Sequence, residues 1–198
     1  MNLFAELGEN TCDFSNLNVE ASVNQLLPRL PKDREITRTV FPGDNGFFET
    51  GRMQATGLDT LKRYGPLQRF CVNGTRLIQF DVVSDGGARL VVPWKSCSGK
   101  EGTITLVAGY SRFTVQLKID AAGTDDILQF MGPNLIVAVE DLDLIFEGAG
   151  PGVRTAVGII AKFLDPVLRE VWKSQFFREF NASLQNIFPV GINPVFRR

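Results

Sequence analysis

The feature that most constrains the fold of this chain is an apolar stripe near its C-terminus, between Val153 and Phe188. Apolar side chains recur there at steps of three and four residues, which is the spacing of one helix face. The stripe comprises Val153, Val157, Ile160, Leu164, Leu168 and Val171, and then Trp172, Phe176, Phe177, Phe180, Leu184, Ile187 and Phe188. It is too wide for a lightly buried surface helix, so we expect a long, largely covered helix over residues 153–188.

The pair Asp165-Pro166 divides this stripe. Aspartate is a favourable N-cap, and proline is tolerated at the first helical position. The main helix is therefore expected to begin at this pair. A shorter helical turn or two is expected before it.

Upstream of the stripe, the chain has the patterns of strands and turns. Residues 113–119 alternate apolar and polar side chains without a break, as a half-buried strand does. The predicted strands are Phe47–Leu58, Leu67–Val72, Arg76–Val83, Ala88–Trp94, Thr103–Val107, Phe113–Ile119 and Leu135–Phe146, with Ala121–Pro133 as a connection.

Turn residues separate these strands. Asn73-Gly74 is the strongest two-residue hairpin signal of the chain, and Gly86-Gly87 is expected to turn the chain again. The pattern predicts an antiparallel meander of about seven strands. Four glycines stand where a bend or bulge would curve the sheet: Gly51, Gly57, Gly65 and Gly109.

The fold class expected from these patterns is α+β, with a highly curved antiparallel sheet wrapped around one long C-terminal helix. An ordinary helix on an ordinary sheet is the alternative. We expect one domain over residues 1–198, with an N-terminal segment (1–45), the sheet (46–147) and the helix (153–188). A short helix over Asn16–Leu27 is expected in the N-terminal segment, with Leu17, Val23, Leu26 and Leu27 inward and with Pro28 and Pro31 ending it.

Composition narrows the function. The chain has no His, so no Ser-His-Asp or Cys-His nucleophile and no His-ligated metal site can form. Carboxylate pairs and Ser-Lys pairs remain formally possible, but we expect no enzymatic activity and no cofactor. The net charge of −1 gives no basic field for nucleic acid, and no apolar run reaches the roughly 20 residues that span a bilayer. Sixteen Phe against two Tyr fit either a Phe-rich core or a Phe-lined cavity for an apolar ligand.

Two motifs that carry chemistry elsewhere are interpreted as structural. The run from Gly148 to Gly152 lies between a strand and a helix, but it lacks the following strand and acid of a dinucleotide site. We interpret it as a flexible turn. Asp141 and Asp143 share one strand face, and we interpret them as a solvated pair rather than a cation or acid–base site.

The three cysteines, Cys12, Cys71 and Cys97, leave at least one thiol unpaired within the chain. If Asn73-Gly74 and Gly86-Gly87 both turn the chain, Cys71 and Cys97 flank one strand about 9–10 Å apart, too far for a disulfide. A bridge from Cys12 to one of the others is at least as favourable.

Two sequons, at Asn73 and Asn181, bear on the compartment. Asn181 falls inside the long helix and is a poor acceptor, whereas Asn73 at a hairpin tip suits glycosylation. Residues 1–9 lack the features of a signal peptide. We expect a mature, secreted protein.

The segment Gly51-Arg52-Met53-Gln54-Ala55-Thr56-Gly57-Leu58-Asp59-Thr60-Leu61-Lys62-Arg63-Tyr64-Gly65 resembles the group-seven dust-mite allergens and their arthropod relatives. Those proteins have a strand, a Gly-Leu corner and a Lys/Arg pair in the same arrangement. Phe163-Leu164-Asp165-Pro166-Val167 resembles their Leu-Asp-Pro helix start, and the resemblance covers about Gly46 to Phe188. The chain departs from the family at its N-terminus, where the mite proteins have a longer amphipathic helix.

This resemblance implies membership of the tubular lipid-binding superfamily, with the bactericidal/permeability-increasing, Takeout-like and juvenile-hormone-binding proteins. It implies the architecture of a BPI-like half-domain, an apolar tunnel between sheet and helix, and no catalysis. The function expected is binding and transport of a hydrophobic small molecule, such as a fatty acid, phospholipid, terpenoid or carotenoid, without stable membrane insertion. The alternative is an interaction protein or assembly subunit with a filled core. In that case the chain could form an oligomer.

Ligand contacts are expected where small β-branched residues of the helix face aromatic residues of the sheet. We expect the cavity over the first half of the helix, and a packed plug over Trp172–Phe180. The ligand-binding residues predicted are Phe80, Val82, Trp94, Phe113, Val115, Leu144, Phe146, Ile160, Leu164, Val167, Leu168 and Val171.

Overall fold

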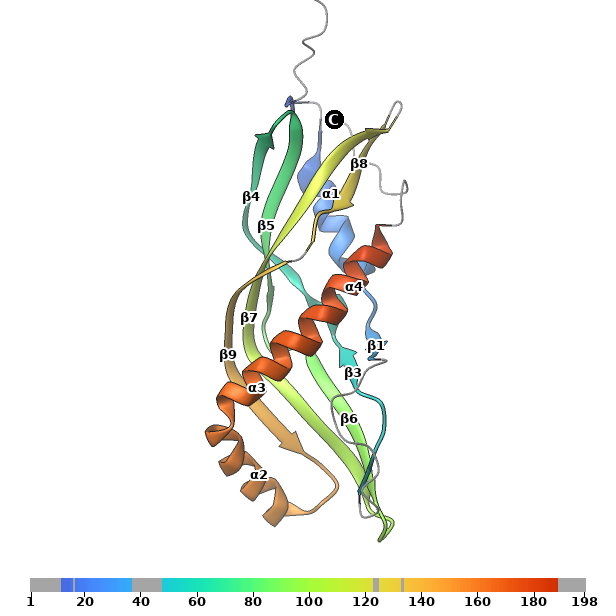
Figure 1. The fold of residues 1–198 in the computed structure, drawn as a ribbon, viewed down its shortest axis with the longest axis vertical. Helices are drawn as coiled ribbons and strands as arrows, with labels where there is room; N and C mark the ends of the chain where they lie inside the picture. Colours follow the sequence, from blue (N-terminus) through green and yellow to red (C-terminus); the bar gives the residue numbers. More distant parts are fainter. Residues whose placement is uncertain (1–11, 16, 37–47, 123–124, 133, 189–198) are drawn as a thin grey trace, which may run out of the picture.

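A computed structural model describes residues 12–15, 17–36, 48–122, 125–132 and 134–188 (Figure 1). Within this part of the chain, nine strands form one antiparallel sheet, and a helical segment at the C-terminal end crosses it. The expected α+β class with a large antiparallel sheet is therefore confirmed.

The strands follow each other in four long antiparallel runs along the molecule. The first run holds β2 (Phe48–Thr50), β3 (Gln54–Thr56) and β4 (Lys62–Val72), and the second holds β5 (Thr75–Ser84) and β6 (Arg89–Ser96). The third run is β7 (Glu101–Ala122) alone, and the fourth holds β8 (Asp125–Phe130) and β9 (Leu135–Phe146). A short strand, β1 (Asp33–Glu35), pairs with β3 at the outer edge.

Three strand predictions need correction. The two strands expected at 103–107 and 113–119 are parts of the single 22-residue strand β7. The expected connection Ala121–Pro133 contains β8, and the expected first strand is divided into β2 and β3. The strand β7 is continuous because both of its edges are paired over its length. β6 and β5 pair with one edge, and β9 and β8 pair with the other.

The turn expected at Gly86-Gly87 is also wrong. Ser84 lies opposite Ser111 of β7 and Arg89 lies opposite Val107, so β5 and β6 continue in one direction along the same edge. The four residues 85–88 are matched by the three residues 108–110, which is a bulge of one residue. The hairpin at Asn73-Gly74 is confirmed, with Val72 opposite Thr75.

At this bulge, a row of residues with close backbone contacts or positive φ values crosses the sheet. A Cβ on Gly57 would meet the Gly87 carbonyl oxygen at 2.2 Å, and a Cβ on Gly109 would meet the Asp141 Cβ at 2.9 Å. Gly57 has a φ of 74° and Asp141 a φ of 52°. We call Gly57, Gly87, Gly109 and Asp141 the bend row. It divides the molecule into an α4 half, with β4, β5 and β8, and an α2 half, with β3 and β6.

The bend row changes which residues face the core. In β7 the buried apolar residues before the row are at even positions, Leu106 and Ala108, and those after it are at odd positions, Phe113 and Val115. In β5 and β6 the inward residues stay even, at Val82 and Leu90, so the one-residue shift in register between these strands and β7 accompanies the change of face in β7. Bends expected at Gly57 and Gly109 are thus present. Gly65, with a φ of 71°, lies at an irregularity of β4, and Gly51 lies between β2 and β3.

The C-terminal helical segment has four parts: α2 (Pro151–Phe163), α3 (Asp165–Val171), the π-helical turn η3 (Trp172–Phe176) and α4 (Phe177–Ile187). A main helix from Asp165 is confirmed, but its N-cap is Leu164, and the Asp165 carboxylate instead accepts a hydrogen bond from Arg169 at 3.1 Å. The segment before it, α2, is a full 13-residue helix rather than a turn or two.

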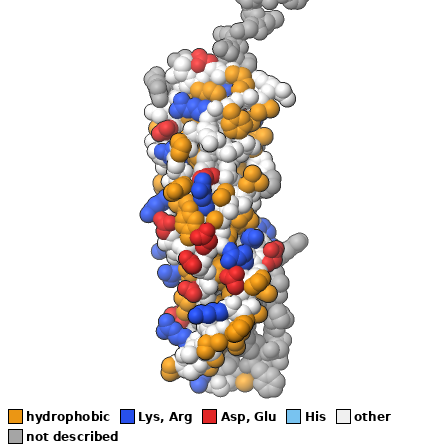
Figure 2. All heavy atoms as spheres, turned by 90° about the vertical axis from the view of Figure 1, so that its left-hand side faces the viewer, with side chains coloured by type: hydrophobic (Ala, Val, Ile, Leu, Met, Phe, Trp, Pro, Cys, Tyr) orange, Lys and Arg blue, Asp and Glu red, His pale blue; other side chains and the backbone are white. Residues whose placement is uncertain are grey.

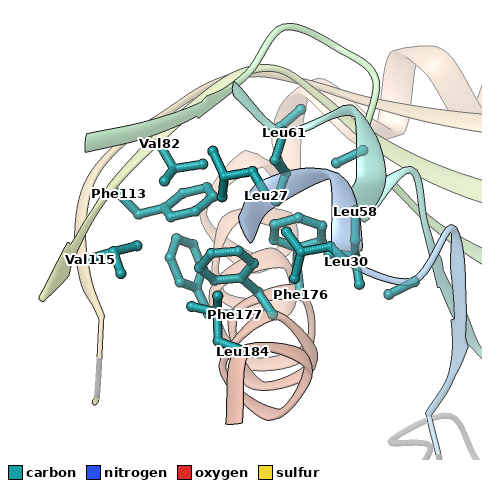
Figure 3. Close-up of a cluster of buried hydrophobic side chains, with 14 of the residues drawn as sticks. Leu27, Leu30, Leu58, Leu61, Val82, Phe113, Val115, Phe176, Phe177 and Leu184 are labelled. Carbon is teal, nitrogen blue, oxygen red and sulfur yellow. The ribbon is translucent and has the colours of Figure 1, made fainter. Parts of the chain in front are cut away.

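The N-terminal segment covers the α4 half. The helix α1 (Val19–Leu26) begins at Asn18, whose side chain accepts a hydrogen bond from the Ala21 N–H at 3.3 Å, and continues into the 3-10 turn η1 (Leu27–Arg29). A second 3-10 turn, η2 (Leu58–Thr60), leads into β4. The expected inward residues are all buried: Leu17, Val23, Leu26 and Leu27. Figure 3 shows Leu27 and Leu30 against the aromatic side chains of the C-terminal helix.

Candidate functional site

The interior of the α4 half is filled. Phe80 pairs across strands with Val115, and Val82 pairs with Phe113, so four predicted ligand contacts come together on the inner face of β5 and β7. The Phe113 ring lies 4.5 Å from that of Phe180, with further contacts to Phe176 and Phe177 (Figure 3). All of these side chains are buried, so this group forms a solid aromatic core.

The predicted sheet residues of the α2 half form a second group. The Trp94 ring stacks on that of Phe146 with centroids 5.1 Å apart, and Trp94 Nε1 donates to the Glu147 carbonyl oxygen at 3.0 Å. Leu144 lies opposite Leu106 on the inner face. Leu144 and Phe146 are only half-buried, although Trp94 is buried. The apolar interior therefore extends into this half but is less completely covered.

The predicted helix residues separate into two kinds. Leu168 is buried and Val171 is half-buried, so both face the sheet. Three others are exposed, by 53%, 40% and 56% of their surface: Ile160, Leu164 and Val167. These three cannot line an interior tunnel in this arrangement.

The prediction of which sheet residues lie opposite which part of the helix is therefore partly wrong. Phe113, which pairs across strands with Val82, packs on Phe177 and Phe180 of α4 and not on the first half of the main helix. The reason is the continuity of β7, which carries Phe113 and Val115 into the α4 half. The expected packing of Phe176 and Phe180 is confirmed by their burial and ring contacts.

The sequence analysis missed a buried polar group in the C-terminal helical segment. Trp172 begins the π-helical turn, is fully buried, and stacks on Phe176 with centroids 4.5 Å apart. Its Nε1 has no hydrogen-bond partner among the described residues, and neither has the buried hydroxyl of Ser111 on β7. Buried polar groups are usually paired, so each exception calls for an explanation. The sequence signal was an indole within an otherwise apolar stripe.

Charged groups lie outside this interior. Asp141 and Asp143 are exposed, as expected of a solvated strand face. On the outer face Arg112 Nε donates to Asp81 at 2.8 Å, and this hydrogen bond raises the pKa of Arg112. The part of the chain that the structure describes holds no group of three His, Cys, Asp or Glu side chains suited to a metal ion. The interior therefore consists of apolar side chains with a buried N–H donor and a buried hydroxyl among them.

The structure distinguishes between the cysteine pairings and the glycosylation sites that the sequence left open. Cys12 forms a disulfide with Cys71, with Cα atoms 5.8 Å apart, and Cys97 is an exposed free thiol. Asn73 is exposed at the β4–β5 hairpin, whereas the Asn181 side chain accepts a hydrogen bond from Asn134 Nδ2 at 2.6 Å. Asn181 is therefore engaged, and Asn73 is the accessible sequon.

Comparison of the sequence with known proteins finds no matching family model and no matching curated protein. In the described residues, none of the helices has both the length and the apolar character needed to cross a membrane.

Proposed function

We propose that this protein is a non-enzymatic carrier of an apolar ligand, held between the sheet and the C-terminal helix as in the tubular lipid-binding superfamily. The ligand class is a lipophile with an acceptor oxygen, such as a fatty acid, phospholipid, terpenoid or oxygenated carotenoid. We place the protein outside the cell, because a disulfide such as Cys12–Cys71 persists in an oxidising compartment.

The observation that carries the proposal is the unpartnered indole N–H of Trp172. It is fully buried, stacks on Phe176, and directly follows the half-buried residue Val171 in the chain. An apolar molecule there would be stabilised by burial, at about 25 cal/mol per Å² of apolar surface. The indole N–H has no accessible surface, so a ligand would have to displace the side chains that cover it. An acceptor oxygen on that ligand would then satisfy the indole and remove the cost of an unpaired buried donor.

The test combines loading with a matched pair of tryptophan variants. Native mass spectrometry and solvent extraction of the purified chain should find a bound lipophile, or the chain should bind a polyene fatty acid added to it. Trp172→Phe should lower the affinity for that fatty acid by about fivefold, which is the effect of one lost hydrogen bond. Trp94→Phe is the control, because the Trp94 N–H is already bonded to Glu147. Failure to find or load any lipophile would refute the proposal.

An interaction or assembly role is the second candidate. The observation favouring it is the apolar surface of α2, where Ile159, Ile160 and Phe163 are exposed. Light scattering separates the two candidates, because a clean monomer argues against an assembly subunit.

A further inference from the structure

The helix α2 carries an unusual amount of exposed apolar surface. Val153, Ile159, Ile160 and Phe163 on α2, with Leu164 at its end, are exposed by 43%, 56%, 53%, 82% and 40%. Val167, in the first turns of α3, adds a further 56% exposed side chain. Single exposed apolar residues are ordinary, but a contiguous group marks an interaction site.

Among the residues that the structure describes, only one edge of α2 is covered. The helix packs on β9, and its buried positions are Ala161 and, in part, Val157. At about 100° per residue, the apolar side chains of α2 form an arc of about 200°. Ala161 and Val157 lie at one end of this arc, and Ile159 and Phe163 lie toward the other. Most of the apolar arc therefore faces solvent.

The remaining arc of α2 is basic. Arg154 and Lys162 are the charged residues from Gly148 to Leu164, and both are exposed. Their separation of eight residues places them on the same side of the helix. The nearest acidic residue along the helix, Asp165, is paired with Arg169. On the neighbouring β9, Asp143 alternates with the core-packed Leu142 and Leu144, so it belongs to the outer face of the sheet. Figure 2 shows hydrophobic side chains beside Lys and Arg at the lower end of the molecule.

We propose that α2, together with Leu164 and Val167, is a peripheral docking surface for an anionic phospholipid bilayer. A helix with a wide apolar face bordered by Lys and Arg lies in the plane of the membrane interface. Ile159, Ile160 and Phe163 enter the boundary between headgroups and acyl chains, while Arg154 and Lys162 bind the anionic headgroups. The site uses surface residues alone, so it does not depend on an interior ligand.

A second copy of the chain fits this surface less well than a bilayer does. A two-fold interface through α2 would place the same helix of two copies face to face. The basic residues Arg154 and Lys162 of each copy would then lie near those of the other, and their repulsion would oppose the contact.

The experiment is vesicle co-flotation of the full chain. Vesicles of phosphatidylcholine and phosphatidylserine, at about four to one, should bind the protein, and pure phosphatidylcholine vesicles should bind it much less. The double variant Ile159→Gln/Phe163→Gln should lower binding by at least about tenfold. Leu135→Gln, at a β9 residue exposed by 67%, is the matched control and should bind as the unchanged chain does.

A charge variant tests the electrostatic attraction of Arg154 and Lys162 to the anionic headgroups. Arg154→Gln/Lys162→Gln, or raised salt with the unchanged chain, should reduce binding to the anionic vesicles by about tenfold. Thermal unfolding checks that each variant is folded. The proposal is overturned if the unchanged chain does not bind anionic vesicles, or if the α2 variants bind as well as the control. A dimer that Phe163→Gln dissociates, without vesicle binding, would assign the surface to a second copy. Loading of a lipophile is measured separately, so a failure here leaves the carrier proposal standing.

Discussion

The two sides of the bend row use the same sheet in different ways. In the α4 half, Phe113, Phe176 and Phe180 are fully buried and in ring contact. In the α2 half, Phe146 is half-buried, and Leu164 and Val167 of the helix are exposed. The sheet has an apolar inner face in both halves, so the difference comes from what covers it. The α4 half is closed by α1 and a row of helix aromatics, whereas the apolar side chains of α2 are largely exposed.

The largest expected effect compares one phenylalanine from each half. Phe113→Ala should lower the free energy of unfolding by about 3–5 kcal/mol, because it opens a cavity in a filled core. Phe146→Ala should cost only about 1–2 kcal/mol, because the side chain is half-buried. Urea unfolding of both variants measures the difference. Equal losses would contradict the contrast between the halves.

The disulfide should matter next. Cys12 and Cys71 tie the N-terminal segment to β4 in the α4 half, across a separation of 59 residues. Replacing both by Ser should lower the free energy of unfolding by about 2–4 kcal/mol, since the unfolded chain regains freedom. Cys97→Ser is the control and should change little, because that thiol is exposed. A double variant as stable as this control would show that the α4 half does not depend on the link.

A smaller effect is expected at the ion pair between β1 and α4. Glu179 is 7% exposed and accepts a hydrogen bond from Arg34 Nε at 2.8 Å. Arg34→Ala should cost about 1–3 kcal/mol, because a buried carboxylate loses a charged partner. Arg52→Ala, which removes the exposed pair with Glu35, should have no measurable effect in thermal unfolding. If both variants behave alike, the pair does not help to close the α4 half.

Local turn signals and helix boundaries were the part of the fold that the sequence made predictable. Asn73 and Gly74 take positive φ values of 49° and 77°, as a two-residue hairpin requires. Pro28 ends α1 within the 3-10 turn η1, and the main helix begins at Asp165. Each of these features is set by residues within a few positions of it, so the sequence alone determines it.

Features set by distant partners were not predictable. The pair Gly86-Gly87 has the composition of a hairpin turn, yet it forms a bulge because β5 and β6 both pair with β7. The change of face between Ala108 and Ser111 looked like a break between strands for the same reason. Strand pairing decides both, and it involves residues far away in the chain.

The candidate site was predictable in part. Leu168, Trp172, Phe176 and Phe180 follow at four-residue steps, which drift by about 40° each around an ideal α-helix. The π-helical turn over Trp172–Phe176 reduces that drift and keeps these residues inward. Neither this turn nor the outward direction of Val167 follows from the periodicity, which is why exposed residues were included among the ligand contacts.

The most direct test of the contrast between the halves is to replace one residue on each side of Trp172 with a larger one. Val171→Trp should reduce loading of a polyene fatty acid while the free energy of unfolding of ligand-free protein changes by less than about 0.5 kcal/mol. Leu184→Trp, in the filled α4 half, should instead lower the free energy of unfolding by about 1–3 kcal/mol through overpacking. Its folded fraction should still load normally. Val171→Trp that destabilises ligand-free protein without changing loading would place Val171 in a filled core and contradict the proposed ligand site.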